Sequence, residues 1–167
     1  KIYPEQVKLV LRIKKIGIVG CGVIGAKIAQ AIVSEFQKVA HLNALYDIDL
    51  GKADNLAKKL KRRNIAALSL EDLITKSDFV LEAASSEVSA EIARKVIRAR
   101  RDCLIMSVGG LLDAPDVFSL AKKKGCSLYI PSGAICGIDG LRAHKLANIK
   151  NVTLITKKPA QALKDSP

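Results

Sequence analysis

Aromatic residues are scarce in this sequence of 167 residues. It has no Trp, three Phe and three Tyr, although 49% of its residues are hydrophobic. A core built from small and branched aliphatic side chains is therefore expected, which is typical of a parallel sheet covered by helices. No apolar run approaches the ~18 residues that a membrane-spanning helix requires, so we expect no membrane partner.

Patterns that bind metals or form disulfides are also missing. The four cysteines form no C-x-x-C pair, and no histidine stands near them at ligand spacing. We interpret the cysteines as small buried residues in a reducing compartment, which predicts a cytoplasmic protein without a metal site. These cysteines are Cys21, Cys103, Cys126 and Cys136.

Acidic residues are outnumbered by basic ones. The chain has 28 Lys and Arg against 16 Asp and Glu, a formal net charge of +12. Such a charge is compatible with a nucleic-acid surface. The cations fall mainly on expected helix faces, however, and no aromatic residues lie among them to stack on bases. We therefore favour solvated helix ends and expect no nucleic-acid partner, an expectation that steeply salt-dependent retention of duplex DNA would contradict.

The most informative segment is KIGIVGCGVIGAKIAQ, residues 15–30. An apolar strand, 16–19, runs into a G-x-G-x-x-G loop and then into a helix. In dinucleotide-binding folds the first glycine permits the turn, the second admits the pyrophosphate and the third packs the helix on the strand. The loop glycines are Gly20, Gly22 and Gly25.

The helix after the loop predicts a phosphate site. Its first amide groups, those of Val23, Ile24 and Gly25, have no partner within the helix and lie at the positive end of its dipole. Apolar residues at helical spacing are expected to form its buried face: Ile24, Ile28, Ala31 and Ile32.

A second apolar strand, 43–48, places Asp47 about twenty residues after Gly25, where a carboxylate can accept hydrogen bonds from ribose hydroxyls. This carboxylate would repel the 2′-phosphate of NADP, so it favours NAD. Lys52 lies close enough in the sequence to soften that preference, and NADP therefore stays possible.

Strands and helices alternate through the rest of the chain. Further strands are expected at 65–68, 78–84, 102–108 and 127–131, with helices at about 50–60, after Ser69, from Ser85 and from Pro115 to Lys124. This order predicts an α/β fold, a Rossmann-type doubly wound parallel sheet with right-handed crossovers.

The sequence also predicts a domain organisation. We expect an N-terminal extension over 1–14, a dinucleotide-binding domain over 15–140, and over 141–167 a linking helix and the first strand, 152–156, of a second α+β substrate domain. The chain is thus expected to be a piece of something longer.

Ligands of such sheets lie beyond the carboxyl ends of the strands. This rule brings together the glycine loop, Asp47 and the small residues after later strands, namely Ala84, Ser85, Ser107, Gly109 and the segment 132–137. A flat cofactor lying across these strand ends explains them together.

The segment IPSGAICGID, 130–139, followed by VTLITKKP, 152–159, resembles the L-aspartate dehydrogenases. The run EAAS, 82–85, and the glycine loop match that family's pattern in order and spacing. The resemblance implies NAD- or NADP-dependent oxidation of L-aspartate to iminoaspartate for NAD biosynthesis, by a homodimer. It also implies cofactor contacts at the glycine loop, Asp47, Ala84, Ser85 and Ala143. Cys136 stands where the family usually has glycine or another small residue.

The resemblance places the catalytic His of the family, and an Asn that touches the cofactor, in an N-x-N-V-A-type region of the second domain. Nothing in this chain corresponds to that region, so the His is expected beyond Pro167 and the chain alone is expected to be inactive. His41 is expected in a surface loop, and His144 on a helix near the cofactor. Neither has a visible acidic partner, and we assign no catalytic residue.

Two other functions stay open. One is a related two-domain NAD(P) oxidoreductase of the dihydrodipicolinate reductase or homoserine dehydrogenase type. The other is a non-catalytic nucleotide-binding module whose natural chain ends near residue 167.

Overall fold

The computed structural model describes residues 13–131 together with Asn151, Thr153 and Ile155. The chain divides into two compact units, Lys1–Pro131 and Ser132–Pro167. All the helices and strands given below belong to the first unit.

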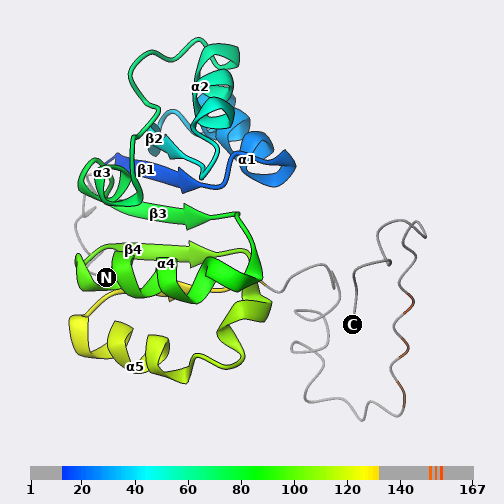
Figure 1. Cartoon of the computed structure of the whole chain (residues 1–167), viewed down its shortest axis with the longest axis vertical. Coiled ribbons are helices and arrows are strands. Elements are labelled where there is room, and N and C mark those ends of the chain that lie inside the picture. The colour runs from blue at the N-terminus through cyan, green and yellow to red at the C-terminus, as the bar shows by residue number, and fades with distance from the viewer. Residues whose placement is uncertain (1–12, 132–150, 152, 154, 156–167) are drawn as a thin grey trace, which may run out of the picture. The chain divides into compact units, whose positions relative to one another are not determined.

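Five parallel strands form a single sheet in the order β2-β1-β3-β4-β5 (Figure 1). The chain moves outward from β1 to β2 and then returns past β1 to β3, which pairs with the other side of β1. The end of β1 is therefore the point at which the strand order reverses, where open α/β sheets bind ligands. The strands are β1 (Lys14–Val19), β2 (Ala40–Tyr46), β3 (Phe79–Glu82), β4 (Asp102–Ile105) and β5 (Leu128–Tyr129).

Helices cover both faces of the sheet. α1 and α2 share one buried apolar cluster with β1 and β2, while α3, α4 and α5 share another with β3 and β4. Neighbouring residues of β1 enter different clusters, Ile18 one and Val19 the other, as the alternation of a strand requires. The predicted doubly wound α/β fold is confirmed. The helices are α1 (Val23–Ser34), α2 (Leu50–Lys59), α3 (Leu70–Thr75), α4 (Ser86–Arg98) and α5 (Pro115–Lys124), with a 3₁₀ turn, η1 (Val108–Leu111).

Within the described residues, no helix combines the length and the apolar character needed to cross a lipid bilayer.

The predicted strand over 65–68 is wrong. Leu45 of β2 donates its amide to Ile65 (2.6 Å) and accepts from the amide of Ala67 (2.7 Å), but the pairing is a single bridge. Asn64, with a φ of +61°, turns the chain immediately before it, and α3 begins soon after. The segment between these turns is too short to continue along the sheet.

Two details near β2 also differ from the prediction. The strand covers Ala40–Tyr46, so Asp47 lies just past its end and His41 lies within it, paired with Lys15, rather than in a loop. The polar start of β2 was not predicted as strand, because an edge strand can keep exposed side chains and so lacks an apolar pattern there.

Thr153 and Ile155, from the predicted strand 152–156, lie in neither a helix nor a strand.

The buried face of α1 was predicted only in part. Ile32 is buried and Ile28 is partly buried against the same core, as expected. The other buried residues are Gly25 and Ala29, while Ile24 is 54% exposed. The close approach of Gly25 to the end of β1 decides which side of the helix faces inward. Ile24 is consequently turned toward solvent.

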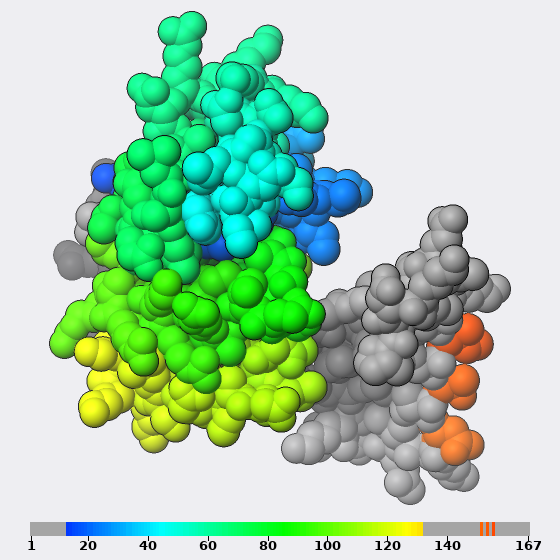
Figure 2. Space-filling model, viewed as in Figure 1, coloured from blue at the N-terminus to red at the C-terminus, as the bar shows by residue number. Residues whose placement is uncertain are grey.

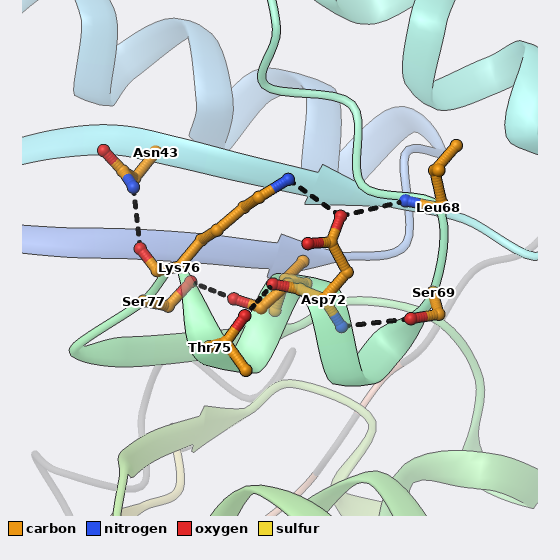
Figure 3. Close-up of polar contacts among 8 residues, drawn as sticks. Asn43, Leu68, Ser69, Asp72, Thr75, Lys76 and Ser77 are labelled. Atoms are coloured by element: carbon orange, nitrogen blue, oxygen red, sulfur yellow. Dashed lines mark hydrogen bonds and ion pairs between the residues drawn. The ribbon is translucent and has the colours of Figure 1, made fainter.

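Polar contacts anchor α3 between β2 and the segment that precedes the helix (Figure 3). Ser69 Oγ accepts the amide of Asp72 at 3.0 Å, which confirms the predicted cap. The Asp72 carboxylate accepts from the Leu68 amide (3.2 Å) and from Lys76 Nζ (2.8 Å). Asn43 of β2 donates to the carbonyl oxygen of Lys76 at 2.7 Å. This short helix is thus held at both ends.

Candidate functional site

The predicted cofactor contacts gather at the carboxyl end of the sheet. The glycine loop follows β1, Asp47 follows β2, Ala84 and Ser85 follow β3, and Ser107 and Gly109 follow β4. All five strands are parallel, so these four connections leave the sheet at the same end. We call this edge the rim.

The three glycines of the loop differ in what surrounds them. Gly20 has a φ of +93°, and a Cβ there would lie 2.7 Å from the amide nitrogen of Ala84. A Cβ at Gly25 would collide with the carbonyl oxygen of Gly20. At Gly22, φ is −69° and a Cβ would meet no atom of the described residues within 4 Å. The fold itself requires glycine at 20 and 25, whereas glycine at 22 keeps space open in front of α1.

The first turn of α1 presents amide groups toward this space. Among the described residues, no acceptor is found for the amides of Val23, Ile24 and Gly25, and Gly22 provides no capping side chain. The first turn also lacks acidic residues that would occupy the positive end of the dipole. These amides can therefore bind an anion such as a pyrophosphate.

Asp47 connects two of the rim loops. Its Oδ2 accepts the amide of Cys21 in the glycine loop at 2.8 Å, and its Oδ1 accepts the amide of Asp49 at 3.0 Å. The residue is only 9% exposed. Each carboxylate oxygen accepts a single protein donor and keeps a further lone pair, so ribose hydroxyls can donate to both.

Glu82 is a site residue to which the sequence analysis assigned no role. It is fully buried at the end of β3 and accepts three hydrogen bonds at the rim. The donors are the amide of Ala84 (2.7 Å), the amide of Ser107 (3.0 Å) and the hydroxyl of Ser107 (2.8 Å). A carboxylate inside an otherwise apolar strand was the signal in the sequence. Glu82 thereby holds together the loops after β3 and β4.

A further hydrogen bond links α4, which follows β3, to the loop after β4. The buried Ser89 of α4 donates its hydroxyl to the carbonyl oxygen of Ser107 at 3.0 Å. A Cβ at Gly110 would collide with the carbonyl oxygen of Ser86, so η1 packs directly on the first turn of α4. Hydrogen bonds from Ser89 and to Glu82, together with the packing at Gly110, therefore connect the two sides of the rim between β3 and β4.

Burial holds the three described cysteines in the thiol form. Burial raises the pKa of Cys21 to about 12, with the charge of Asp47 adding to the effect. Burial likewise raises the pKa of Cys103 to about 12 and, in a half-buried setting, raises that of Cys126. All three thiols are protonated at neutral pH, which agrees with their predicted role as small apolar residues.

Several predicted features lie outside the described residues, namely Ala143, His144, Cys136 and the segment 132–137. Over 13–131 the structure brings no group of three His, Cys, Asp or Glu side chains together at metal-binding distance.

The residues present fit a dinucleotide. Open space at Gly22 faces the unpaired amides of α1, and a buried carboxylate stands at the end of the next strand. Residues 20–131 match the family model described as "Homoserine dehydrogenase, NAD binding domain". The chain belongs to this family of NAD-binding domains.

The chain is similar over most of its length to curated proteins named L-aspartate dehydrogenase. That of Methanosarcina barkeri is 41% identical over 156 residues, which cover 92% of this chain and 57% of the relative. That of Methanocaldococcus jannaschii is 41% identical over 156 residues, 91% of this chain and 58% of the relative. The chain therefore spans little more than half the length of these relatives. The resemblance predicted from the sequence is confirmed, as is NAD as the cofactor.

Solved structures share the fold of this NAD-binding domain. UDP-N-acetylglucosamine 3-dehydrogenase GnnA from Acidithiobacillus ferrooxidans superimposes with a TM-score of 0.65 at 22% identity, over 80% of this chain and 44% of that one. GenD2 from gentamicin A biosynthesis, solved in complex with NAD, gives a TM-score of 0.63 at 24% identity, over 87% and 42% of the two chains. At these identities the likeness concerns the fold alone.

Proposed function

We propose that this chain is the cofactor-binding part of an NAD-dependent L-aspartate dehydrogenase. The observation that carries the proposal is the identity of about 40% to L-aspartate dehydrogenases along nearly the whole chain, glycine loop and rim included. The reaction removes two electrons and two protons from the Cα–N bond of L-aspartate and gives iminoaspartate. NAD, when bound, supplies the hydride acceptor for this oxidation.

The contribution of the described residues to this reaction is binding and orientation. The amides of Val23, Ile24 and Gly25 would hold the pyrophosphate, and Asp47 would accept from the ribose hydroxyls. The loops that Glu82 joins, with Ala84, Ser85, Ser107 and Gly109, would fix the cofactor along the rest of the rim. A cofactor held in one orientation removes much of the entropic part of the barrier.

The cofactor part of the proposal is tested by calorimetry with NAD and NADP. We expect binding of NAD, weaker binding of NADP, and in Asp47→Asn a ratio of the two affinities that falls by roughly tenfold, equal to about 1.4 kcal/mol. Asn lacks the charge that would repel a 2′-phosphate but keeps an acceptor for the Cys21 amide. Asp49→Asn, two residues further along the same loop, is the matched control. An unchanged ratio in Asp47→Asn would remove this residue from the site.

The substrate part is tested on the full-length protein with L-aspartate and L-homoserine in parallel. We expect reduction of NAD with L-aspartate. Turnover with L-homoserine only would favour the homoserine dehydrogenase type, a candidate that the description of the matching family model supports. NAD binding without turnover of either amino acid would favour the non-catalytic module.

The proposal extends to the whole protein. It includes possible use of NADP, a role in NAD biosynthesis, a homodimer and a cytoplasmic location, all of which the family resemblance supports. It also places the catalytic His in sequence beyond Pro167. Size-exclusion chromatography with light scattering on the full-length protein would test the dimer.

A further inference from the structure

Charged side chains are sorted between the two ends of the sheet. The rim and the helix starts beside it carry mostly acidic residues, among them Asp49, Glu87 and Asp116. The opposite end, where strands begin and helices finish, carries mostly cations. We call this end the basic face and define it by the cations within Lys14–Lys15, Lys58–Arg63, Arg98–Arg101 and Lys122–Lys124.

Helix dipoles explain only part of the basic face. A helix C-terminus carries roughly half a negative charge, so the ends of α2, α4 and α5 together present roughly 1.5 charges. The cations of the basic face are several times as many. Among the described residues, Lys58 pairs with Asp54 (2.5 Å) and Arg101 lies 4.0 Å from Asp78, while no ion pair is found for the others. The face therefore keeps a large positive excess.

The backbone gives independent evidence that charge is favoured there. α2 and α4 end in the same type of turn. The amide of Arg62 donates to the carbonyl oxygen of Ala57 (3.0 Å), and the amide of Arg101 donates to the carbonyl oxygen of Val96 (3.2 Å). In each turn one residue adopts the left-handed conformation that favours glycine. α5 meets this requirement with Gly125, at a φ of +67°.

At the ends of α2 and α4 the left-handed position holds a cation. Lys61 has a φ of +53° and Arg100 a φ of +57°. Glycine would adopt either conformation without steric cost, so the cap alone does not call for these side chains. A cation kept where glycine would fit without strain motivates the hypothesis that the charge itself has a use.

A groove of about 870 Å³ runs along α2 and the segment that follows it and reaches the basic face. Its cationic lining residues are Lys58, Lys61, Arg62 and Arg63, and the rest of the lining includes Asp54 and the apolar residues Leu50 and Leu68. In Figure 2 this segment, between α2 and α3, stands out from the surface with extended side chains. A strand of nucleic acid can lie along a groove of this kind, with its phosphates beside these exposed cations.

We propose that the basic face binds the phosphate backbone of nucleic acid without reading its sequence. Lysine and arginine side chains neutralise phosphates and release counterions, and this term supplies nearly all of the affinity in non-specific binding. The scarcity of aromatic residues in the chain argues against base stacking as a second source of affinity. The left-handed backbone conformations of Lys61 and Arg100, together with the groove, argue against our expectation that these cations are merely solvated helix ends.

Fluorescence anisotropy of the 167-residue chain with a labelled DNA duplex and a labelled RNA strand tests the proposal. We expect binding that weakens steeply as salt rises from about 50 to about 200 mM, with a slope of about −0.9 per phosphate neutralised. The double variant Lys61→Gly/Arg100→Gly should retain its melting temperature or raise it, since glycine suits both turns. Its affinity should fall by roughly tenfold and its salt slope by about two units.

The matched control is Lys27→Gln/Lys52→Gln, two exposed cations outside the basic face, which should leave binding unchanged. NAD should not compete, because the rim lies at the opposite end of the sheet. Three results would overturn the proposal: absence of binding at low salt, an equal loss in the control variant, or binding to anionic vesicles in place of both nucleic acids. None of these measurements depends on dehydrogenase activity.

Discussion

At the scale of single residues, Gly22 is a position where glycine is expected to be required for binding the ligand but not for the fold. Its φ suits alanine and a Cβ would meet no atom of the described residues, but alanine is a poorer N-cap than glycine, so Gly22→Ala should change the free energy of unfolding by less than about 0.5 kcal/mol. The same Cβ would fill the space in front of α1, and we expect roughly tenfold weaker NAD binding. Calorimetry and thermal melting measure the two effects.

Gly25→Ala is the contrasting variant. A Cβ at this position collides with backbone, and the expected loss of stability is about 1–3 kcal/mol. If Gly22→Ala bound NAD as tightly as the native chain, the pyrophosphate would have to lie elsewhere.

Glu82 is the second residue whose role depends on tertiary contacts. Gln at this position would turn an amide donor toward groups that already donate, Ser107 among them. We expect Glu82→Gln to lose about 2 kcal/mol of unfolding free energy. NAD affinity should fall as well, because the loops after β3 and β4 lose their common anchor. Chemical denaturation and calorimetry measure these changes.

Ser107→Ala removes only one of the three hydrogen bonds to Glu82 and should have a smaller effect than Glu82→Gln. Equal unfolding midpoints for Glu82→Gln and the native chain would show that this buried carboxylate is not an anchor.

At the scale of elements, α3 depends on its cap more than on its length. It has six residues, and a helix this short gains little from its own hydrogen bonds. Ser69→Ala should therefore lower the unfolding free energy by about 1 kcal/mol, measured by urea denaturation. Thr75→Ala, which removes a hydroxyl at the other end of the helix, is the comparison. An unchanged unfolding free energy in Ser69→Ala would mean that the start of α3 is held by its buried leucines rather than by Ser69.

The scale of the element also explains the errors of the sequence analysis. The run 65–68 has the composition of a strand, but Asn64 and the Ser69 cap leave room for a single bridge. Composition cannot report how many residues a neighbouring strand leaves available for pairing. By contrast, Pro115 and Gly125 marked the bounds of α5 correctly, because both act through local backbone geometry.

At the scale of the whole molecule, surface ion pairs make the fold sensitive to acid. A hydrogen bond from Arg94 lowers the pKa of Asp116 below its ordinary 3.8, and one from Lys76 lowers the pKa of Asp72. Because each folded-state pKa lies below the unfolded value, the stabilisation is complete above about pH 4 and is lost as the pH falls through the folded values. We expect the melting temperature to drop as the pH falls from about 4 to about 2.

The double variant Asp72→Asn/Asp116→Asn should show a shallower drop, since it removes two of the groups responsible. Glu35→Gln, at the exposed end of α1, is the control and should follow the native curve. A native melting temperature that stays constant over this range would contradict the assignment.

The sequence by itself determined the alternation of strands and helices, the parallel α/β fold, the glycine loop and the family. These depend on periodicity and on local backbone requirements, which a short stretch of chain contains in full. Only the tertiary structure decided that Glu82 joins two loops, that Asp47 holds the glycine loop, and that the cations meet on one face. These facts arise between residues far apart in the chain, where the packing of the sheet, and no local pattern, sets the distance.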